Sequence, residues 1–386
     1  MGLSIARELK RVHPGSSIAL IEKERDCGLH ASGRNSGVLH AGFYYSADSL
    51  KARFTKMGNA MLTQYCESRN IRINRCGKIV VARDENDFAC LDELLKRARA
   101  NQIELFEITE KEAKEIEPRV KTFKRAAFSP STSTVNPRAV MEAIKKDAVN
   151  EGIKLNCGVK YLGKGKNGIE TSAGVYKTGY CVNAAGLYAD RIAMDYGFSE
   201  RYRLLPFKGL YLYSDEPAGS LRTNIYPVPD LKNPFLGVHF TVTSENRVKI
   251  GPTAIPAFWR EQYGFLQNFN IQELFEIVLR ELNLFAFSEF SFAKLAFEEL
   301  RKYSRERMVN MAGALAGGVK RENFSTWGKP GIRAQLVDVK KKKLKMDFVI
   351  EGDDRSMHVL NAVSPAFTCS IPFSKYVVEE ITTYLN

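Results

Sequence analysis

The first residues of the chain have the pattern of one helix, one tight turn and one strand that ends in an acid. In MGLSIARELKRV, the apolar residues Leu3, Ile5 and Leu9 recur at helical spacing, with basic residues on the other side. Pro14-Gly15 ends this helix, and SIALIE follows as a short apolar strand. This order is typical of an α/β unit with a parallel sheet. A bare helix–strand hairpin, which is common in proteins, has the same pattern.

The same stretch has the spacing of the second half of a dinucleotide-binding unit. In such units the last glycine of G-x-G-x-x-G begins the helix, and an acidic residue about 20 positions later holds the ribose hydroxyls. Gly2 and Glu22 have this separation. The other glycines and the preceding strand would lie upstream of Met1, so we expect a unit that is cut just before its phosphate loop.

Length and element order predict an α/β fold, α+β in part, with about two domains. A chain of 386 residues with 44% hydrophobic content can bury a substantial core. Helical and strand-rich segments interleave, which favours a Rossmann-like domain and an interleaved second domain built on a mixed or antiparallel sheet plus helices. Residues 272–306 are predicted to be helical, with phenylalanines 275, 285, 287, 290, 292 and 297 in the core.

Net charge and cysteine content limit the classes of partner, metal site and cellular location that we expect for the protein. Lys and Arg exceed Asp and Glu by 57 to 44, a net charge of +13, which suits an anionic substrate, an anionic membrane surface or nucleic acid. The basic run VKKKKLKMD (339–347) is predicted to be two strands with a solvated hairpin, ahead of a membrane patch and then nucleic-acid binding. The seven cysteines and five histidines lack metal-site spacing, so we expect no metal. No signal peptide is visible, and a cytoplasmic location is the default expectation.

Two segments have the composition of nucleotide-binding turns. HASGRNSGVLHAGFYY (30–45) is rich in glycine and small polar residues, which lets backbone amides approach an anion or a flat ring system. GYCVNAAGLYADRIA (179–193) has a strand, a small-residue turn and a helix start, an arrangement that suits phosphates. An ordinary polar loop and a tight strand–helix connection explain them equally well.

Two further residues have side chains suited to acid–base or carboxylate chemistry. His239 is expected on a strand, where a histidine is usually structural but becomes a candidate base beside a cofactor. Arg333 of GIRAQLVD could bind a carboxylate bidentately or form an interdomain salt bridge.

Several segments follow one another along the chain: ALIEKE, SGRNSGVLHAGFYY, SLKARF, CGKIVVA, NAAGLYADR, PFKG, YPVPD, PFLGVHFT, GPTAIPAFWREQY, GIRAQLVD and SPAFTCSIP. In this order they resemble the FAD-dependent L-2-hydroxyglutarate dehydrogenases/oxidases, a branch of the D-amino-acid-oxidase-like flavoproteins. The resemblance extends from Gly2 to about Tyr376. It implies an FAD-binding domain of residues 1–76, 140–203 and 326–386, and a substrate-binding domain of residues 77–139 and 204–325.

The resemblance implies oxidation of L-2-hydroxyglutarate, a dicarboxylate, to 2-oxoglutarate, with electrons passed to a quinone or oxygen. The basic charge makes peripheral contact at the inner face of the membrane an additional expectation, and no nucleic-acid partner is expected. A related flavin oxidase of another 2-hydroxy acid or an amino acid, or an inactive form unable to hold FAD, are the alternatives. The family carries a central strand and a phosphate loop ahead of Gly2, and we expect their absence to expose apolar sheet surface and weaken FAD binding.

The resemblance assigns roles at matching positions. Hydride removal from a 2-hydroxy acid needs a base for the hydroxyl proton, and an imidazole with a near-neutral pKa suits this task. His239 is the preferred base, with His40 second because it lies within the flavin-binding loop. Arg333 is the first choice to hold a carboxylate, followed by Tyr45, Lys208 and Gln335. The implied FAD-binding residues are Gly2, Glu22, Lys23, Ser32, Gly33, Arg34, Asn35, Ser36, Gly37, Val38, Val159, Asn183, Ala184, Gly186, Asp190, Ser364, Thr368 and Ser370.

Overall fold

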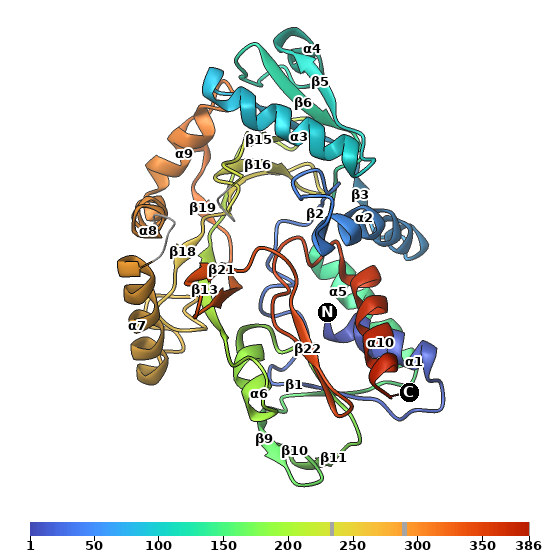
Figure 1. The fold of residues 1–386 in the computed structure, drawn as a ribbon. Coiled ribbons are helices and arrows are strands. Elements are labelled where there is room, and N and C mark those ends of the chain that lie inside the picture. Colours follow the sequence, from blue (N-terminus) through green and yellow to red (C-terminus); the bar gives the residue numbers. More distant parts are fainter. Residues whose placement is uncertain (232–234, 288–291, 386) are drawn as a thin grey trace.

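The computed structural model describes residues 1–231, 235–287 and 292–385. The chain begins with the expected helix and strand, α1 (Gly2–Val12) and β1 (Ala19–Glu22). The apolar side of α1 is buried because Leu3, Ile5 and Ala6 pack into clusters shared with other helices. Figure 1 shows α1 next to two of these helices, close to the chain termini. The packed helices are α2 (Leu50–Ser68), α5 (Pro137–Asn150) and α10 (Ser370–Leu385).

Short parallel ladders accompany these helices. β1 pairs in parallel with β8 (Lys154–Cys157), and β12 (Cys181–Asn183) pairs in parallel with β23 (Ser356–Val359). β22 (Ile350–Gly352) extends the second ladder. Within the described residues β1 and β12 form no ladder with each other, and both border the cavity described below. This side of the molecule confirms the predicted α/β class. An antiparallel excursion follows β8, formed by β9 (Tyr161–Gly165), β10 (Gly168–Thr171) and β11 (Gly174–Lys177).

A mixed sheet forms the other side of the molecule. Its strands β4 (Lys78–Val81) and β15 (Asn224–Pro227) run parallel, and the other neighbouring strands are antiparallel. Its apolar cluster includes Ile79, Phe240 and Ile250, and it receives Met308 and Ala312 from α9 (Arg305–Gly313). In order across the sheet, the strands are β19 (Thr326–Trp327), β14 (Leu212–Tyr213), β17 (Val248–Gly251), β16 (His239–Val242), β15 (Asn224–Pro227), β4 (Lys78–Val81), β6 (Arg125–Ser129) and β5 (Phe106–Thr109).

Two smaller sheets join the parts of the chain. β13 (Tyr202–Gly209) pairs along its whole length with β20 (Gly331–Asp338), between β18 (Ile255–Pro256) and β21 (Lys343–Leu344). The predicted boundary at residue 326 therefore falls ahead of two strands, β19 and β20, that pair with strands of the other predicted domain. The other sheet contains β2 (Val38–Leu39), β7 (Ser133–Val135) and β3 (Ile73–Asn74).

The remaining helices cover the outer surfaces. They are α3 (Phe88–Ala100), α4 (Glu110–Ile116), α6 (Ala189–Asp195), α7 (Ile271–Phe287), α8 (Phe292–Leu300) and α9 (Arg305–Gly313), with short 3-10 turns η1 (Glu85–Asp87), η2 (Gly186–Tyr188), η3 (Arg301–Tyr303) and η4 (Arg321–Asn323).

The structure confirms the hairpin predicted for the basic run and contradicts the core position predicted for two phenylalanines. The run at 339–347 forms a hairpin between β20 and β21, as predicted. Phe275 and Phe297, expected in the core, are instead exposed. The side chains of phenylalanines 285, 287, 290 and 292 lie outside the described residues. In the described part of the chain, no helix combines the length and apolarity that crossing a bilayer requires.

Candidate active site

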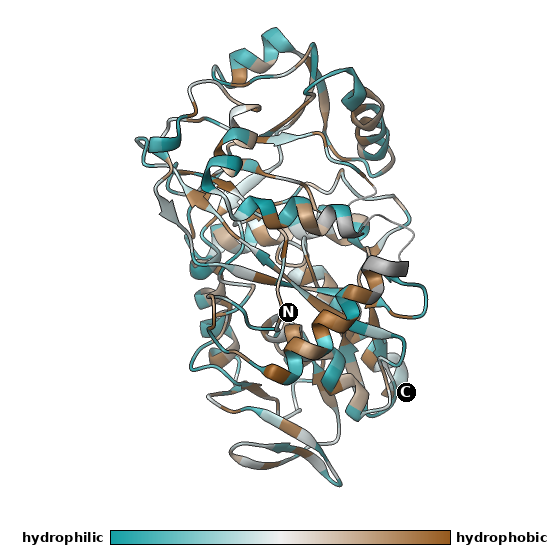
Figure 2. Ribbon diagram, turned by 90° about the vertical axis from the view of Figure 1, so that its left-hand side faces the viewer, coloured by the Kyte–Doolittle hydropathy of each residue, from teal (hydrophilic) through white to brown (hydrophobic). Residues whose placement is uncertain are grey.

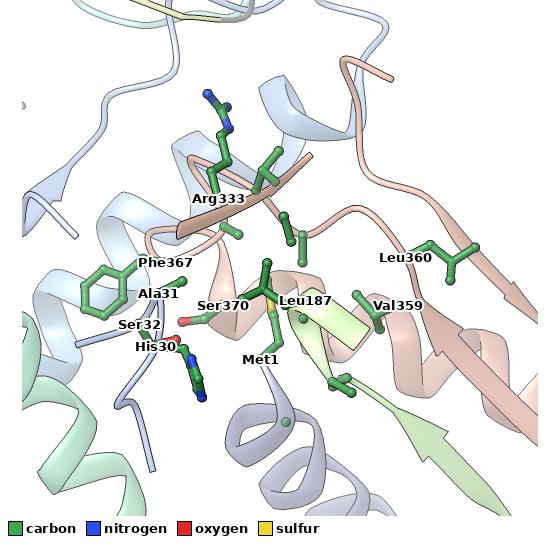
Figure 3. A pocket seen from close by; sticks show the side chains of 18 of the residues that line it. Met1, His30, Ala31, Ser32, Leu187, Arg333, Val359, Leu360, Phe367 and Ser370 are labelled. Carbon is green, nitrogen blue, oxygen red and sulfur yellow. The ribbon is translucent and has the colours of Figure 1, made fainter. Parts of the chain in front are cut away.

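A cavity of about 2010 Å³ lies between the two sides of the molecule. Sites for drug-sized ligands usually measure about 300–1,000 Å³, so this space can hold a dinucleotide together with a second molecule. Figure 3 shows Met1 at the start of α1, with His30, Ala31 and Ser32 on one side and Val359 and Leu360 on the other.

The N-terminus of α1 opens into this cavity. Gly2 lines it, and among the described residues no side chain caps the first turn of the helix. Uncapped first-turn amides and the positive end of the helix dipole favour an anion at this position. The placement agrees with the predicted role of Gly2 beside a phosphate.

The loop predicted to lie along a flat ring system is held in shape by its own hydrogen bonds. The Asn35 side chain donates to the Ser32 carbonyl at 2.6 Å and accepts from the Gly37 amide at 2.8 Å. Gly37 has a φ of +79°, and a Cβ there would meet the Val135 carbonyl oxygen at 2.2 Å. Gly33 and Gly37 thus shape the loop and do not line the cavity, whereas Ser32, Arg34, Asn35, Ser36 and Val38 do.

Two other turns complete the nucleotide side. The Asn183 side chain accepts from the Ala185 amide at 3.1 Å and donates to the Ala189 carbonyl at 2.8 Å, which fixes the turn after β12. The Thr368 hydroxyl accepts from the His40 amide at 3.2 Å and so ties the C-terminal turn to the glycine-rich loop. The predicted residues of these turns that line the cavity are Asn183, Ala184, Gly186, Ser364, Thr368 and Ser370, joined by Val159 after β8.

Asp190 does not reach the cavity. It is fully buried, and its carboxylate forms a bidentate pair with Arg260 at 2.7 and 3.0 Å. It also accepts from the Leu204 amide at 3.0 Å. These bonds occupy both carboxylate oxygens, so Asp190 joins α6 to β13 and to the segment after β18. Sequence reasoning missed Arg260 because a long-range partner leaves no local signal.

Glu22 and Lys23 both line the cavity at the end of β1. The Glu22 carboxylate accepts from the Glu24 amide at 3.0 Å. Lys23 forms ion pairs with Glu24, at 2.8 Å, and with Glu261. Glu24, His30 and Glu261 have potential ligand atoms within 4.8 Å of one another, but the Lys23 ammonium already pairs with both carboxylates. The absence of a metal site therefore stays a prediction.

A stacked pair of side chains lies in the wall of the cavity near the mixed sheet. The His239 ring stacks on Tyr226 with centroids 3.6 Å apart, and His239 Nδ1 lies 2.9 Å from the Gly237 carbonyl oxygen. Because a carbonyl only accepts, this contact places the proton on Nδ1 and leaves a lone pair on Nε2. The cavity is also lined by His40, whose Nδ1 has no hydrogen-bond partner in the described part of the chain.

Lys78 lies behind this pair and was not predicted as a functional residue. It is 0% exposed, and its Nζ is 4.2 Å from the Tyr226 ring centroid. Burial lowers the pKa of Lys78 to about 7. Burial and then the Lys78 charge lower the pKa of His239 to about 3, and the same causes lower the pKa of His40 well below its usual value. Both imidazoles therefore have pKa values below the near-neutral value that was expected for the base.

Two cations line the cavity close to each other. Lys51 is buried on α2, and burial followed by repulsion from Arg333 lowers its pKa to about 7. Burial likewise lowers the pKa of Arg333 to about 10, and Tyr45 and Tyr211 oppose this shift. Adjacent cations in a poorly solvated wall favour an anionic ligand, because its charge relieves their repulsion. Lys51 was not predicted.

The two remaining predicted substrate residues are placed differently. Phe207 and Gly209 of β13 line the cavity, but Lys208 between them does not. Its Nζ lies 3.3 Å from the Tyr303 hydroxyl instead, since successive strand side chains point to opposite faces. Gln335 lines the cavity and donates to the Lys345 carbonyl at 2.7 Å, and its Oε1 has no partner among the described residues.

Together, these features define an α/β protein with a dinucleotide-sized site: uncapped helix amides, a glycine-shaped loop, an acid at the end of β1 and enough space. Residues 1–380 match the family described as DAO, FAD dependent oxidoreductase, and the chain belongs to this family. The match confirms the resemblance and the prediction of FAD as cofactor.

Curated relatives match over nearly the whole chain. The mitochondrial L-2-hydroxyglutarate dehydrogenase of Nematostella vectensis is 34% identical, with 98% of this chain and 88% of the relative covered. The L-2-hydroxyglutarate dehydrogenase of Escherichia coli (strain K12) is 32% identical and covers 100% and 92%. The mitochondrial enzyme of Homo sapiens is 33% identical and covers 99% and 86%.

Solved structures share the fold. The L-alpha-glycerophosphate oxidase from Mycoplasma pneumoniae, with FAD bound, superposes with a TM-score of 0.75 at 17% identity, covering 100% of this chain and 91% of that one. Glycine oxidase from Geobacillus kaustophilus gives a TM-score of 0.73 at 20% identity, covering 99% and 91%.

Proposed function

We propose that the chain oxidises L-2-hydroxyglutarate to 2-oxoglutarate in this cavity. The observation that carries the proposal is the placement of Lys51, Arg333 and His239 in the wall of the cavity that receives the N-terminus of α1. A 2-hydroxy dicarboxylate needs one group for its alcohol proton and cationic groups for its carboxylates. The named specificity of the curated relatives supports this choice.

FAD, when bound, supplies the acceptor for the hydride that leaves the substrate carbon. His239 takes the hydroxyl proton on Nε2, because Nδ1 is held by the Gly237 carbonyl. Tyr226 fixes the plane of the imidazole by stacking. A bound dianion raises the pKa of His239 from about 3, since an opposite charge favours the imidazolium. His239 therefore waits in its neutral form and becomes a stronger base when substrate enters.

Lys51 and Arg333 hold a substrate carboxylate in this proposal. The guanidinium offers a planar fork for bidentate binding, and the ammonium adds a point charge. Tyr45 lines the cavity with Arg333, and its neutral hydroxyl offers a further hydrogen-bonding group. Gln335 adds an amide on the same strand as Arg333. We propose no substrate contact for Lys208.

Electrons leave toward a quinone or oxygen in the second half of the reaction, and we propose peripheral contact with the membrane. A competing proposal is a form that holds FAD weakly. It is favoured by the open space between β1 and β12, whose strand edges have no ladder partner on that side within the described residues.

We expect the purified chain, supplied with FAD, to show flavin absorbance that L-2-hydroxyglutarate bleaches under anaerobic conditions. The D isomer and glycine should leave the absorbance unchanged, because His239 and the cationic pair accept one arrangement of hydroxyl, hydrogen and carboxylates. Absence of flavin absorbance after gel filtration would favour the weak-binding alternative. Bleaching by another 2-hydroxy acid or an amino acid alone would identify a related oxidase.

Removing one cation should weaken substrate binding much more than catalysis. For Arg333→Met or Lys51→Met we expect KM to rise about 10- to 100-fold with a smaller change in kcat, since the lost contact holds the substrate in both ground and transition states. Steady-state kinetics measure this. Lys56→Met is the matched control because Lys56 is exposed on the same helix, α2. Equal effects in Lys51→Met and Lys56→Met would contradict the assignment.

A further inference from the structure

A surface helix usually turns its apolar side to the core and its charged side to solvent, but α7 buries acidic residues and exposes apolar ones. It buries Glu273 and Glu281 together with Ile277 and Leu284. Glu273 pairs with Arg191 at 2.9 Å. Burial raises the pKa of Glu281 to about 8, and its Oε1 has no partner among the described residues. The side chains turned outward are apolar: Phe275, Leu279 and Leu282 are 63%, 65% and 57% exposed.

The exposed apolar surface continues on both sides of α7. The segment that leads into the helix exposes Phe265, at 89%, together with Leu266 and Phe269, and α8 exposes Phe297. We call this set the α7 face: Phe265, Leu266, Phe269, Ile271, Phe275, Leu279, Leu282 and Phe297. Figure 1 places α7, α8 and α9 in one column along the left edge, and Figure 2, which faces that edge, shows apolar colouring along helices there. Contiguous exposed patches of this kind mark protein or membrane contacts.

Basic residues flank the α7 face. Val337 and Leu344, on the two strands of the lysine-rich hairpin, pack in one apolar cluster with Ile277 and Leu284 of α7. The hairpin therefore leaves its sheet beside this helix, and it exposes Lys340, Lys341 and Lys343. At the other end, the Arg301 guanidinium lies 5.8 Å from the Phe297 ring centroid.

We propose that the α7 face docks the protein on a bilayer surface rich in anionic phospholipid. An apolar helix side flanked by lysine and arginine is the pattern of helices that lie in the membrane interface, where apolar side chains enter the acyl boundary and cations meet lipid phosphates. A second copy of the chain fits less well. Both flanks of the α7 face are basic, so a two-fold interface would set the basic flank of one copy against a basic flank of the other, and like charges oppose that contact.

The inference deepens the proposed peripheral contact and does not depend on the identity of the substrate. We expect the full chain to float with phosphatidylglycerol/phosphatidylcholine vesicles in a density gradient, more weakly at high salt, and not with phosphatidylcholine alone. The double substitution Phe275→Ser/Leu279→Ser should reduce vesicle binding about tenfold or more. The matched control, Leu162→Ser/Val175→Ser, changes equally exposed residues of the β9–β11 sheet and should not change binding.

The lysine hairpin is tested separately. Lys340→Glu/Lys341→Glu should reduce binding to the anionic vesicles and abolish its salt dependence. The proposal is overturned if the unaltered chain stays unbound, if both serine pairs act alike, or if light scattering shows a concentration-dependent dimer that Phe275→Ser/Leu279→Ser disrupts without vesicles. Anaerobic flavin bleaching, recorded on the same samples, tests the proposed reaction independently.

Discussion

Replacing His239 with alanine is expected to slow flavin reduction by L-2-hydroxyglutarate by about 10²- to 10⁴-fold, the usual contribution of a positioned general base. The structure provides the reason: the Gly237 carbonyl holds the Nδ1 proton at 2.9 Å, so Nε2 is free to accept the alcohol proton. Stopped-flow absorbance under anaerobic conditions measures flavin reduction directly, because reoxidation of the flavin by oxygen does not take place. Binding should change little, because the two cations remain.

His40→Ala is the informative comparison for this base assignment. His40 also lines the cavity, and burial also lowers its pKa, but its Nδ1 has no partner among the described residues to fix its tautomer. We expect a smaller loss of rate in this variant. If His40→Ala slows flavin reduction as predicted for His239 while His239→Ala does not, His40 is the base and our assignment is wrong.

Lys78→Met is expected to stabilise the fold and to make the free energy of unfolding less dependent on pH. A lysine in the unfolded chain keeps its proton to a pKa of about 10.4, whereas folded Lys78 has a pKa of about 7. The unfolded state therefore binds more protons between these values, and stability rises with pH across this window. Methionine removes that cost, so the free energy of unfolding at pH 7 should increase by roughly 1–4 kcal/mol. Urea titrations at several pH values measure both effects.

The same substitution should shift the acid limb of kcat/KM to higher pH. Lys78 is one of the charges that lower the pKa of His239, so its removal lets that pKa rise. A base must be unprotonated, and activity is lost as pH falls through its pKa, so the loss should begin at a higher pH in the variant. A buried lysine whose removal stabilises the protein lowers the stability of the fold, and residues of this kind are often kept for function.

Lys208→Met is the control that separates the effect of Lys78 on stability from its effect on the acid limb of kcat/KM. Lys208 is also buried and its pKa is also lowered by burial, but it lies outside the cavity lining and contacts Tyr303. Its replacement should leave the acid limb in place. An identical shift in both variants, or none in Lys78→Met, would show that Lys78 does not act on His239.

Local patterns predicted several of the elements that border the cavity, because the determinants of these elements are local. The helix of Gly2, the strand ending at Glu22 and the turn after Asn183 follow from periodicity and from small residues at fixed positions. The fold class and the cofactor followed from the order of such segments along the chain. Gly33 and Gly37 were associated with the right loop, but their contribution is to its shape, because a side chain there would meet backbone atoms.

Other assignments depended on long-range contacts that no local pattern contains. Asp190 sits at a helix start like a nucleotide-binding residue, yet Arg260, far along the chain, occupies its carboxylate. Phe275 and Phe297 have the composition of core residues, but α7 buries its glutamates instead. Whether a charged side chain is buried or faces a cavity depends on which oppositely charged neighbours the folded chain places beside it.

The sequence by itself determined the α/β class, because helix and strand periodicity and glycine placement are local. The order of its motifs determined the resemblance to the flavoprotein family, which made the turns candidate nucleotide-binding segments and His239 a candidate base. Only the tertiary structure decided which cations reach the cavity. Strand register turns Lys208 away, α2 brings in Lys51, and a buried Lys78 lies behind Tyr226. Electrostatic energies depend on distance and burial, and both are properties of the folded chain.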